Sequence, residues 1–197
     1  MLVEHINALG SLPASFTYAE ARRLGLSERR LRQLFDLGLL SRPGRGVYRR
    51  VDAPPADEDL LEIAHRVPQA TLCLLTALAR HELTDRIPDR LDMAIPRRHR
   101  LPRVGAPVRW HRFAEATYAT GREILSLEDG LTLGLYSPER SIVDAFRLRH
   151  LEGEDVAIEA LRRWLHRPKS APATLLEVAR DFPGAAPALR NALRILL

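Results

Sequence analysis

The chain has 197 residues, of which 46% are hydrophobic, enough for one large globular domain or two small ones. Its net charge of +5 is compatible with an acidic partner such as nucleic acid, and Lys169 is the only lysine among its positive residues. The single cysteine, Cys73, excludes an intrachain disulfide and fits a reducing cytoplasm, where we expect the protein. No segment reaches the roughly 18 to 20 apolar residues that cross a bilayer, and we expect no signal peptide and no membrane partner.

Residues 1–52 have the pattern of a winged helix-turn-helix. An amphipathic first helix is expected from the spacing of its apolar residues, Leu2, Val3, Ile6 and Leu9. A second helix is predicted to begin after Thr17, because Glu20 three residues later completes the spacing of a capping box. Gly25 is suited to the left-handed conformation in which many helices end.

A third helix is predicted to begin after Ser27, which is suited to cap its first turn. Leu31, Leu34 and Phe35 recur at helical spacing, so we expect all three to face inward. Arginine and glutamine on the other side can contact guanine and adenine edges in the major groove. We therefore predict four DNA-binding residues on this helix: Arg29, Arg30, Arg32 and Gln33. Of these, Arg29, Arg32 and Gln33 are the expected base readers.

A two-stranded ribbon is predicted to follow as the wing, with strands at residues 39–42 and 47–50 and a Pro-Gly-Arg-Gly tip at residues 43–46. Its arginines are expected to lack an acidic neighbour, which suits contacts with DNA phosphates. The predicted phosphate contacts are Arg42, Arg45, Arg49 and Arg50. Two other interpretations stay open. The third helix can be a solvated, arginine-rich helix, or the helix-turn-helix can bind a protein.

Residues 57–197 are predicted to form a second, mixed α/β domain with a helical C-terminal end, so that the whole chain has an α+β fold. Residues 70–83 are apolar nearly all round and predict one buried helix, with Cys73 as a core residue. Strands are predicted at 91–96 and 108–113, and a hairpin around Asp129 and Gly130. Further helices are expected from Ser137 onward and at residues 155–166, 174–180 and 186–196.

Residues 97–112 form a second basic stretch without any aspartate or glutamate. This stretch can bind nucleic acid, a phosphorylated ligand or an acidic protein. Equally, its arginines can pair with distant carboxylates such as Asp85, Asp89 and Asp92. The arginines of this predicted second patch are Arg97, Arg98, Arg100, Arg103, Arg109 and Arg112.

Catalytic and metal-binding motifs are poor. The histidines lack metal-ligand spacing, one cysteine cannot build a zinc knuckle, and no glycine-rich phosphate loop is present. We therefore predict no catalytic residue, no metal site and no cofactor. An enzyme acting on nucleic acid or nucleotides would require Asp92, Glu123 and a histidine to converge in one pocket.

Several short motifs follow one another along most of the chain. In the first part they are residues 26–31, Leu-Ser-Glu-Arg-Arg-Leu, and 44–49, Gly-Arg-Gly-Val-Tyr-Arg. In the second part they are residues 74–78, 87–90, 93–97 and 109–112, and residues 136–144, Tyr-Ser-Pro-Glu-Arg-Ser-Ile-Val-Asp. Together they resemble the AbiEi-type antitoxins of type IV toxin–antitoxin systems, whose family has a threonine form of the last motif.

The resemblance implies a protein with two activities. The winged domain would bind double-stranded DNA at inverted repeats in its own promoter and repress transcription. The second domain would act as an antitoxin against a nucleotidyltransferase-like toxin, without forming a stable complex with it. Family members can also be solitary regulators, so a stand-alone regulator without a toxin is the alternative.

Overall fold

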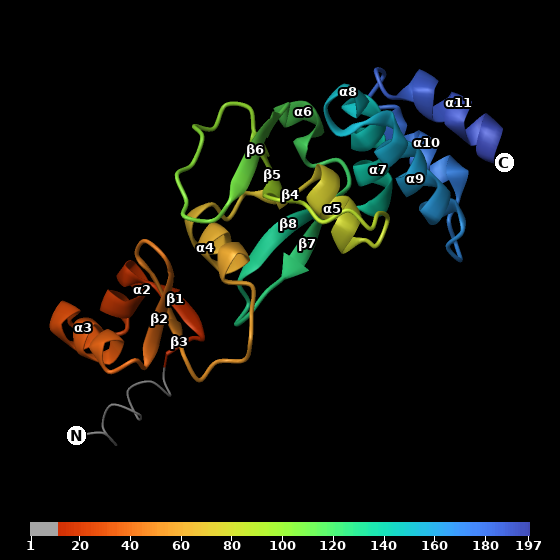
Figure 1. Cartoon of the computed structure of the whole chain (residues 1–197). Helices are drawn as coiled ribbons and strands as arrows, with labels where there is room; N and C mark the ends of the chain where they lie inside the picture. The colour runs from red at the N-terminus through yellow and green to blue at the C-terminus, as the bar shows by residue number, and fades with distance from the viewer. Residues whose placement is uncertain (1–11) are drawn as a thin grey trace. The chain divides into compact units, whose positions relative to one another are not determined.

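The computed structural model describes residues 12–197 and has a mixed α+β fold, which confirms the predicted fold class (Figure 1). The chain divides into two compact units. Of the described residues, the first unit contains 12–69, 102–107 and 126–133, and the second contains 70–101, 108–125 and 134–197. The predicted helix through Leu2, Val3, Ile6 and Leu9 lies outside the described residues. No helix in the described part of the chain is long and apolar enough to cross a membrane.

The first unit contains the two helices and the ribbon expected from the sequence, and a strand that the sequence analysis did not predict. The elements are β1 (Ser15–Thr17), α2 (Tyr18–Arg23), α3 (Glu28–Asp36), β2 (Leu40–Gly44) and β3 (Val47–Arg50). β3 pairs antiparallel with both neighbours, in the order β1-β3-β2. Phe16 of β1 lies opposite Tyr48, with the two ring centroids 6.0 Å apart, so the additional strand supplies part of the core.

Local signals in the sequence fix the ends of the two helices. The Glu20 N–H donates to Thr17 Oγ1 at 3.2 Å and the Thr17 N–H donates to Glu20 Oε2 at 2.6 Å, which confirms the capping box. Ser27 Oγ accepts a hydrogen bond from the Arg30 N–H at 3.1 Å and begins α3. Gly25, with φ of +85°, takes the left-handed conformation that glycine adopts without steric cost.

The buried face of α3 is narrower than the spacing of its apolar residues suggests. Leu31 and Leu34 are 2% and 0% exposed, but Phe35 is 43% exposed, so the prediction that Phe35 faces inward is wrong. The reason is its neighbour: the guanidinium of Arg42 lies 5.8 Å from the centre of the Phe35 ring. Burial of that ring would require an apolar element at this place.

Helix α4 (Glu58–Arg66) belongs to the first unit and begins at Asp57, whose carboxylate accepts the Leu60 N–H at 3.1 Å. Glu62 of this helix is fully buried, which the sequence analysis did not anticipate. Its carboxylate accepts hydrogen bonds from the backbone N–H groups of Gly105 and Ala106, each at 2.9 Å. The first unit is therefore larger than residues 1–52. The domain boundaries 1–52 and 57–197 remain a prediction.

The second unit is built on a five-stranded sheet of strand order β6-β5-β4-β8-β7. Two of its pairs, β5 with β6 and β4 with β8, are parallel, and β4 pairs antiparallel with β5. The strands are β4 (Thr71–Leu72), β5 (Leu91–Pro96), β6 (Val108–Phe113), β7 (Arg122–Ser126) and β8 (Thr132–Tyr136). The turn between β7 and β8 holds Asp129 and Gly130 at φ of +49° and +77°, as the hairpin signal predicts.

The single buried helix predicted for residues 70–83 is wrong. Thr71 and Leu72 form the central strand of the sheet, and α5 (Leu74–Arg80) follows Cys73. Thr71, Leu72 and most of α5 are buried, so the apolar run has too little polar interruption to show a period that separates a strand from a helix. Cys73 is fully buried, as predicted for a core residue.

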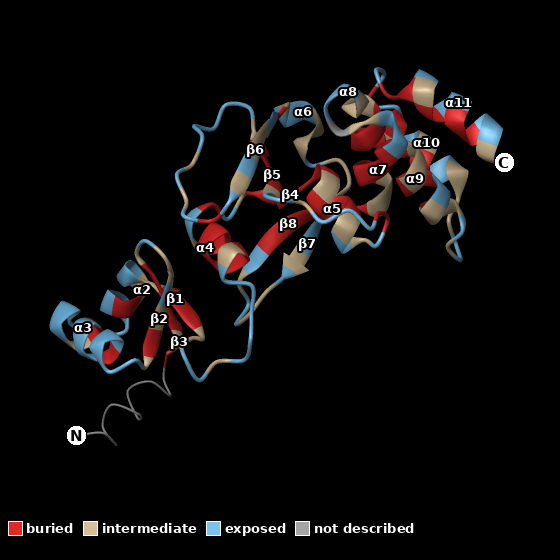
Figure 2. Cartoon of the chain, in the orientation of Figure 1, coloured by how far each residue is buried: buried red, intermediate tan, exposed pale blue. Residues whose placement is uncertain are grey.

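The chain ends in a group of helices around one apolar core, drawn in red in Figure 2. Its centre is α7 (Pro138–Arg147), in which Ile142, Val143 and Phe146 are buried as predicted. Trp164 and Leu175 from later helices complete the core. The remaining helices of the unit are α6 (Glu115–Tyr118), α7 (Pro138–Arg147), α8 (Arg149–Glu152), α9 (Glu154–Leu165), α10 (Pro172–Ala179) and α11 (Ala186–Leu196).

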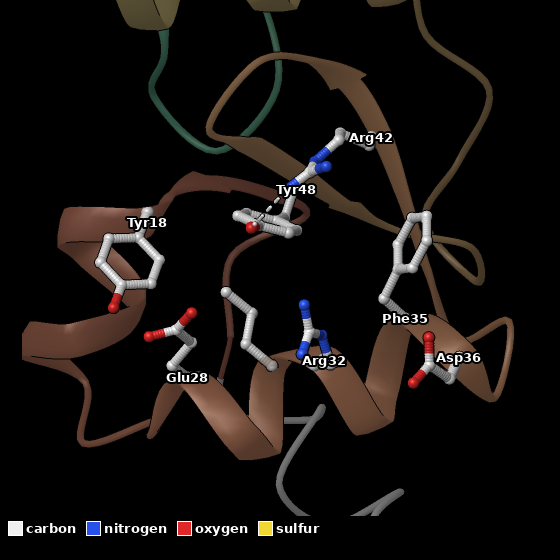
Figure 3. A pocket seen from close by; sticks show the side chains of 8 residues that line it. Tyr18, Glu28, Arg32, Phe35, Asp36, Arg42 and Tyr48 are labelled. Carbon is white, nitrogen blue, oxygen red and sulfur yellow. Dashed lines mark hydrogen bonds between the residues drawn. The ribbon is translucent and has the colours of Figure 1, made fainter.

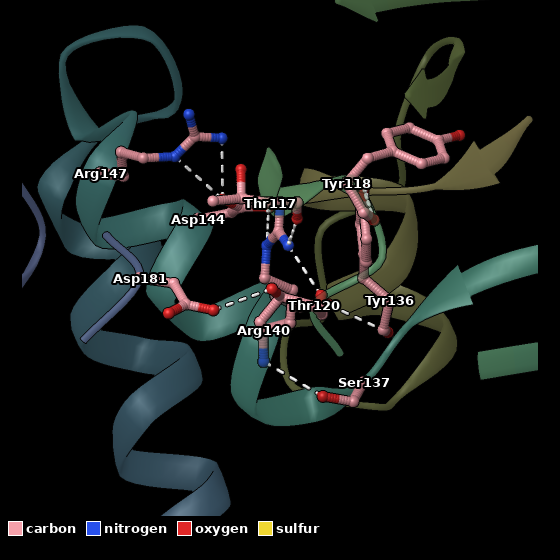
Figure 4. A network of polar contacts seen from close by, with 10 residues as sticks. Thr117, Tyr118, Thr120, Tyr136, Ser137, Arg140, Asp144, Arg147 and Asp181 are labelled. Carbon is pink, nitrogen blue, oxygen red and sulfur yellow. Dashed lines mark hydrogen bonds and ion pairs between the residues drawn. The ribbon is translucent and has the colours of Figure 1, made fainter. Parts of the chain in front are cut away.

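A charged network is buried at the start of α7 (Figure 4). Arg140 is fully buried, its Nε donates to Asp144 at 2.9 Å, and its Nη1 donates to the carbonyl oxygens of Thr117 and Thr120 at 2.7 Å. Its guanidinium lies 4.2 Å from the ring centres of both Tyr136 and Phe182. Because no surface of Arg140 reaches solvent, this network holds α7 in place and offers no binding site.

Candidate nucleic-acid interface

Helix α3 and the β2–β3 hairpin enclose an open hollow of about 420 Å³ on the surface of the first unit (Figure 3). Arg32 projects into it from α3, and Arg42 and Tyr48 face it from the hairpin. Two half-exposed aromatic rings, Tyr18 at 39% and Phe35 at 43% exposure, lie at its sides. The hollow therefore combines cationic, acidic and aromatic groups; its acids are Glu28 and Asp36.

The residues expected to read bases lie on the exposed side of α3. Arg29, Arg32 and Gln33 are all exposed, and Arg30 is intermediate. Leu31 and Leu34 are buried in the core of the first unit and fix the backbone of α3. The exposed side chains of the helix therefore project from a fixed backbone. Arginine and glutamine in this position have the reach and the paired donors that recognition of base edges requires.

Arg42 is held by aromatic contacts in the hairpin. Its Nη2 donates to the hydroxyl oxygen of Tyr48 at 3.0 Å, and its guanidinium lies 5.2 Å from the centre of the Tyr48 ring. These contacts fix the direction of an otherwise flexible side chain while it stays exposed. Arg45 is exposed beside Gly46, whose φ of +78° forms the tip of the hairpin.

Arg49 does not lie where the sequence analysis placed it. It is 6% exposed, it donates to the carbonyl oxygen of Pro54, and its Nη2 pairs with Glu128 at 3.0 Å. The prediction of a phosphate contact at Arg49 is therefore wrong, and so is the expected absence of acidic neighbours. The partner lies 79 residues further along the chain, beyond the reach of any local pattern.

Arg50 has a local acidic partner. Its guanidinium forms two hydrogen bonds with Asp52, at 2.9 and 2.7 Å, and a third with the carbonyl oxygen of Leu12 at 3.0 Å. The hydrogen bonds from Arg50 lower the pKa of the Asp52 carboxyl. Arg50 therefore carries little free positive charge toward DNA, in contrast to Arg42 and Arg45.

The arginines of the second basic stretch are all exposed, but they do not lie in one unit. Arg103 belongs to the first unit and the other five to the second. Arg109 pairs with Asp89 at 3.4 Å and with Asp92 at 3.6 Å, as expected if distant carboxylates neutralise the stretch. Asp85 pairs instead with Arg163, outside the stretch.

The residues named for a catalytic centre do not converge. Asp92 is buried and its carboxylate lies 2.8 Å from Nε2 of His111 on the neighbouring strand. Glu123, however, is exposed on β7, which is separated from β5 by both β4 and β8. Among residues 12–197, no group of three or more histidine, cysteine, aspartate or glutamate side chains is placed to hold a metal ion.

Comparison with known proteins supports the resemblance in the first part of the chain. Residues 16–51 match a family model described as "Transcriptional regulator, AbiEi antitoxin". The crystal structure of the RV2827C protein from Mycobacterium tuberculosis is similar, with a TM-score of 0.53 and 22% sequence identity over 98% of this chain and 78% of that one. At this identity the likeness concerns the fold. No curated protein matches the sequence.

Proposed function

We propose that this protein is a DNA-binding transcriptional autorepressor that also acts as the antitoxin of a type IV toxin–antitoxin system. Its first ligand is double-stranded DNA with inverted repeats in its own promoter. Its second role is to counteract a nucleotidyltransferase-like toxin without a stable complex between the two proteins. We place the first role on the segment that matches the regulator family, residues 16–51, and the second on residues 57–197.

The observation that carries the DNA-binding role is the exposed polar side of α3 beside a hairpin with two exposed arginines, Arg42 and Arg45. In this proposal Arg29, Arg32 and Gln33 enter the major groove and read base edges. Arg42 and Arg45 contact phosphates on the flanking backbone and set the position of the helix. Arg30 lies at the edge of this surface. Arg49 has no part in it, because its charge is buried against Glu128.

Two substitutions test this docking model with the full-length protein and a fragment of its own upstream DNA. Arg32→Ala should weaken binding to the specific site by about 1–3 kcal/mol and relax specificity at one position. Arg45→Ala should weaken binding to all sequences alike and reduce the slope of log affinity against log salt by about one. Gel shifts over a range of salt concentrations measure both effects.

Arg190→Ala is the matched control, because Arg190 is an exposed arginine on α11, far along the chain from residues 16–51. It should leave affinity and salt slope unchanged. The docking model fails if both test variants shift the promoter fragment as well as the wild type does.

A protein-interaction module is the second candidate, since the half-exposed rings of Tyr18 and Phe35 are also suited to contact a protein. In that case upstream DNA would not be bound at physiological salt. A stand-alone winged-helix regulator without a toxin partner is the other alternative, and it would still bind that DNA. We propose no enzymatic activity, because the two acids considered for a nuclease, Asp92 and Glu123, lie on β5 and β7, which β4 and β8 separate.

A further inference from the structure

We propose that Glu28 and Asp36 help to determine which DNA sequence α3 binds, by accepting hydrogen bonds from cytosine amino groups on either side of a guanine contacted by Arg32. This inference rests on the proposed function, because it requires α3 to lie in the major groove. It assigns a role to two acidic residues on a surface where arginine alone would bind any DNA.

The three side chains lie in a single row along α3. Residues 28, 32 and 36 are four positions apart, so they share one side of the helix. All three are exposed, and all three line the hollow between α3 and the β2–β3 hairpin (Figure 3). The helix therefore presents negative, positive and negative charge in succession along this row.

Neither carboxylate has a partner within residues 12–197: no ion pair or hydrogen bond reaches the side chain of Glu28 or Asp36. Other acids of the same unit do have partners. Asp52 pairs with Arg50 at 2.7 Å, and the buried Glu62 pairs with Arg66 at 3.2 Å. The two acids of the hollow thus keep their hydrogen-bonding capacity for a ligand.

An unpaired carboxylate at a DNA interface is repelled by every phosphate, which lowers binding to DNA of arbitrary sequence. A hydrogen bond from the cytosine N4 amino group can offset that repulsion. Cytosine suits a carboxylate better than adenine does, because adenine places its N7 acceptor beside its N6 donor. Arg32 between the two acids has the complementary chemistry, since arginine donates to guanine O6 and N7. The row therefore favours G·C pairs through its hydrogen bonds to cytosine and guanine. The repulsion between its carboxylates and the phosphates weakens binding to DNA that lacks these pairs.

The spacing of the row limits where those cytosines lie. Four residues of an α-helix span about 6 Å along its axis, and successive base pairs are about 3.4 Å apart. Each carboxylate therefore reaches a base about two pairs from the guanine of Arg32. The expected half-site has a guanine with a cytosine within about two base pairs on each side, on either strand.

Selection from a randomised duplex library tests the proposal with the full-length protein. The proteins to compare are the wild type, Glu28→Gln and Asp36→Asn. The affinity of each is measured for the selected site and for a duplex of unrelated sequence. Each variant should lose the preference for cytosine at one base position only. At that base position the new Gln or Asn side chain should favour adenine instead. The ratio of specific to non-specific affinity should fall by about 5- to 150-fold.

Glu154→Gln is the matched control, because Glu154 is also an exposed acid at the first position of a helix, α9. It should leave the selected sequence and the affinity ratio unchanged, while thermal melting confirms that every variant is folded. Selected sequences identical to those of the wild type in both test variants would overturn the proposal, even if Arg32→Ala abolishes specificity. If the wild type itself selects no sequence, the proposed function fails and this inference with it.

Discussion

At the scale of single residues, the buried carboxylate of Glu62 shows how closely this small unit is packed. It accepts two backbone N–H groups from residues 102–107 and lies against Gly44 of β2. A Cβ atom added at Gly44 would lie 2.2 Å from Glu62 Cδ, closer than any real contact. Glycine at this position is therefore required for lack of space, and the tip of the hairpin depends on it.

Gly44→Ala should consequently destabilise the first unit by about 1–3 kcal/mol, the usual cost of overpacking. Thermal or urea unfolding followed by circular dichroism measures the loss. Gly184→Ala provides the control, because an added Cβ there meets no atom within 4 Å. Equal midpoints for the two variants would mean that Glu62 can move aside.

At the scale of elements, the sequence predicted those parts whose signals are local. The capping box at Thr17 and the N-cap at Ser27 placed α2 and α3, and the hairpin around Asp129 followed from its turn residues. β1 was missed because its three residues are too few to show alternation. The burial of Phe35 was overestimated because periodicity shows on which side of the helix a residue lies. It does not show whether an apolar element of the fold covers that side.

The candidate site was predicted in the same uneven way. Helix α3 presents its arginines as expected, because one helix carries both the inward leucines and the outward polar groups. Arg49 was misassigned, since its partner Glu128 is distant in sequence. Glu28 and Asp36 were not among the predicted site residues, because their place in a hollow with Arg42 depends on how the hairpin packs against the helix.

The contact of α4 with β1 and α2 should make the first unit sensitive to mild acid. Ser15 Oγ lies 3.0 Å from Nε2 of His65, and Glu20 lies 3.8 Å from Nδ1. Burial lowers the pKa of His65 below 6.5, and the nearby Glu20 and Glu128 offset this only in part. Because the unfolded chain then binds the proton more readily than the folded one, stability is lost as the pH falls below the unfolded value of about 6.5.

We expect the unfolding midpoint of the wild type to fall between pH 7.5 and 5.5, a window above the titration of most carboxylates. His65→Gln should flatten this dependence while lowering stability at pH 7.5. Denaturant unfolding at several pH values compares the two proteins. If the unfolding midpoint of the variant depends on pH as steeply as that of the wild type, another group causes the pH dependence.

At the scale of the whole molecule, residues proposed for the two roles can be chosen from separate compact units, so the two roles should be separable by substitution. Arg97, Arg98 and Arg100 are exposed in the second unit, whereas Arg32 lies in the first. Replacing the three arginines together by alanine should abolish rescue from a co-expressed toxin and leave promoter binding intact. Arg32→Ala should do the opposite.

A growth assay with the toxin gene, paired with gel shifts of the same proteins, measures both activities. Arg190→Ala again serves as the variant expected to keep both. If the triple variant rescues growth as well as the wild type does, the second basic stretch has no part in antitoxin activity. The neighbouring gene offers an independent check, since a nucleotidyltransferase next to this gene would supply the toxin.

The pairing of Arg49 with Glu128 has a consequence for anyone who wishes to transplant the DNA-binding segment. A fragment that stops near residue 52 would leave Arg49 on β3 without its counterion Glu128 and without the carbonyl oxygen of Pro54 to which it donates. In the intact chain, where Arg49 stays buried, removing Glu128 alone would cost about 3–5 kcal/mol, a large part of the stability of a small domain. Chimeric repressors made from this protein should therefore carry residues 126–133 with the helices, or replace the arginine by an apolar side chain of similar length.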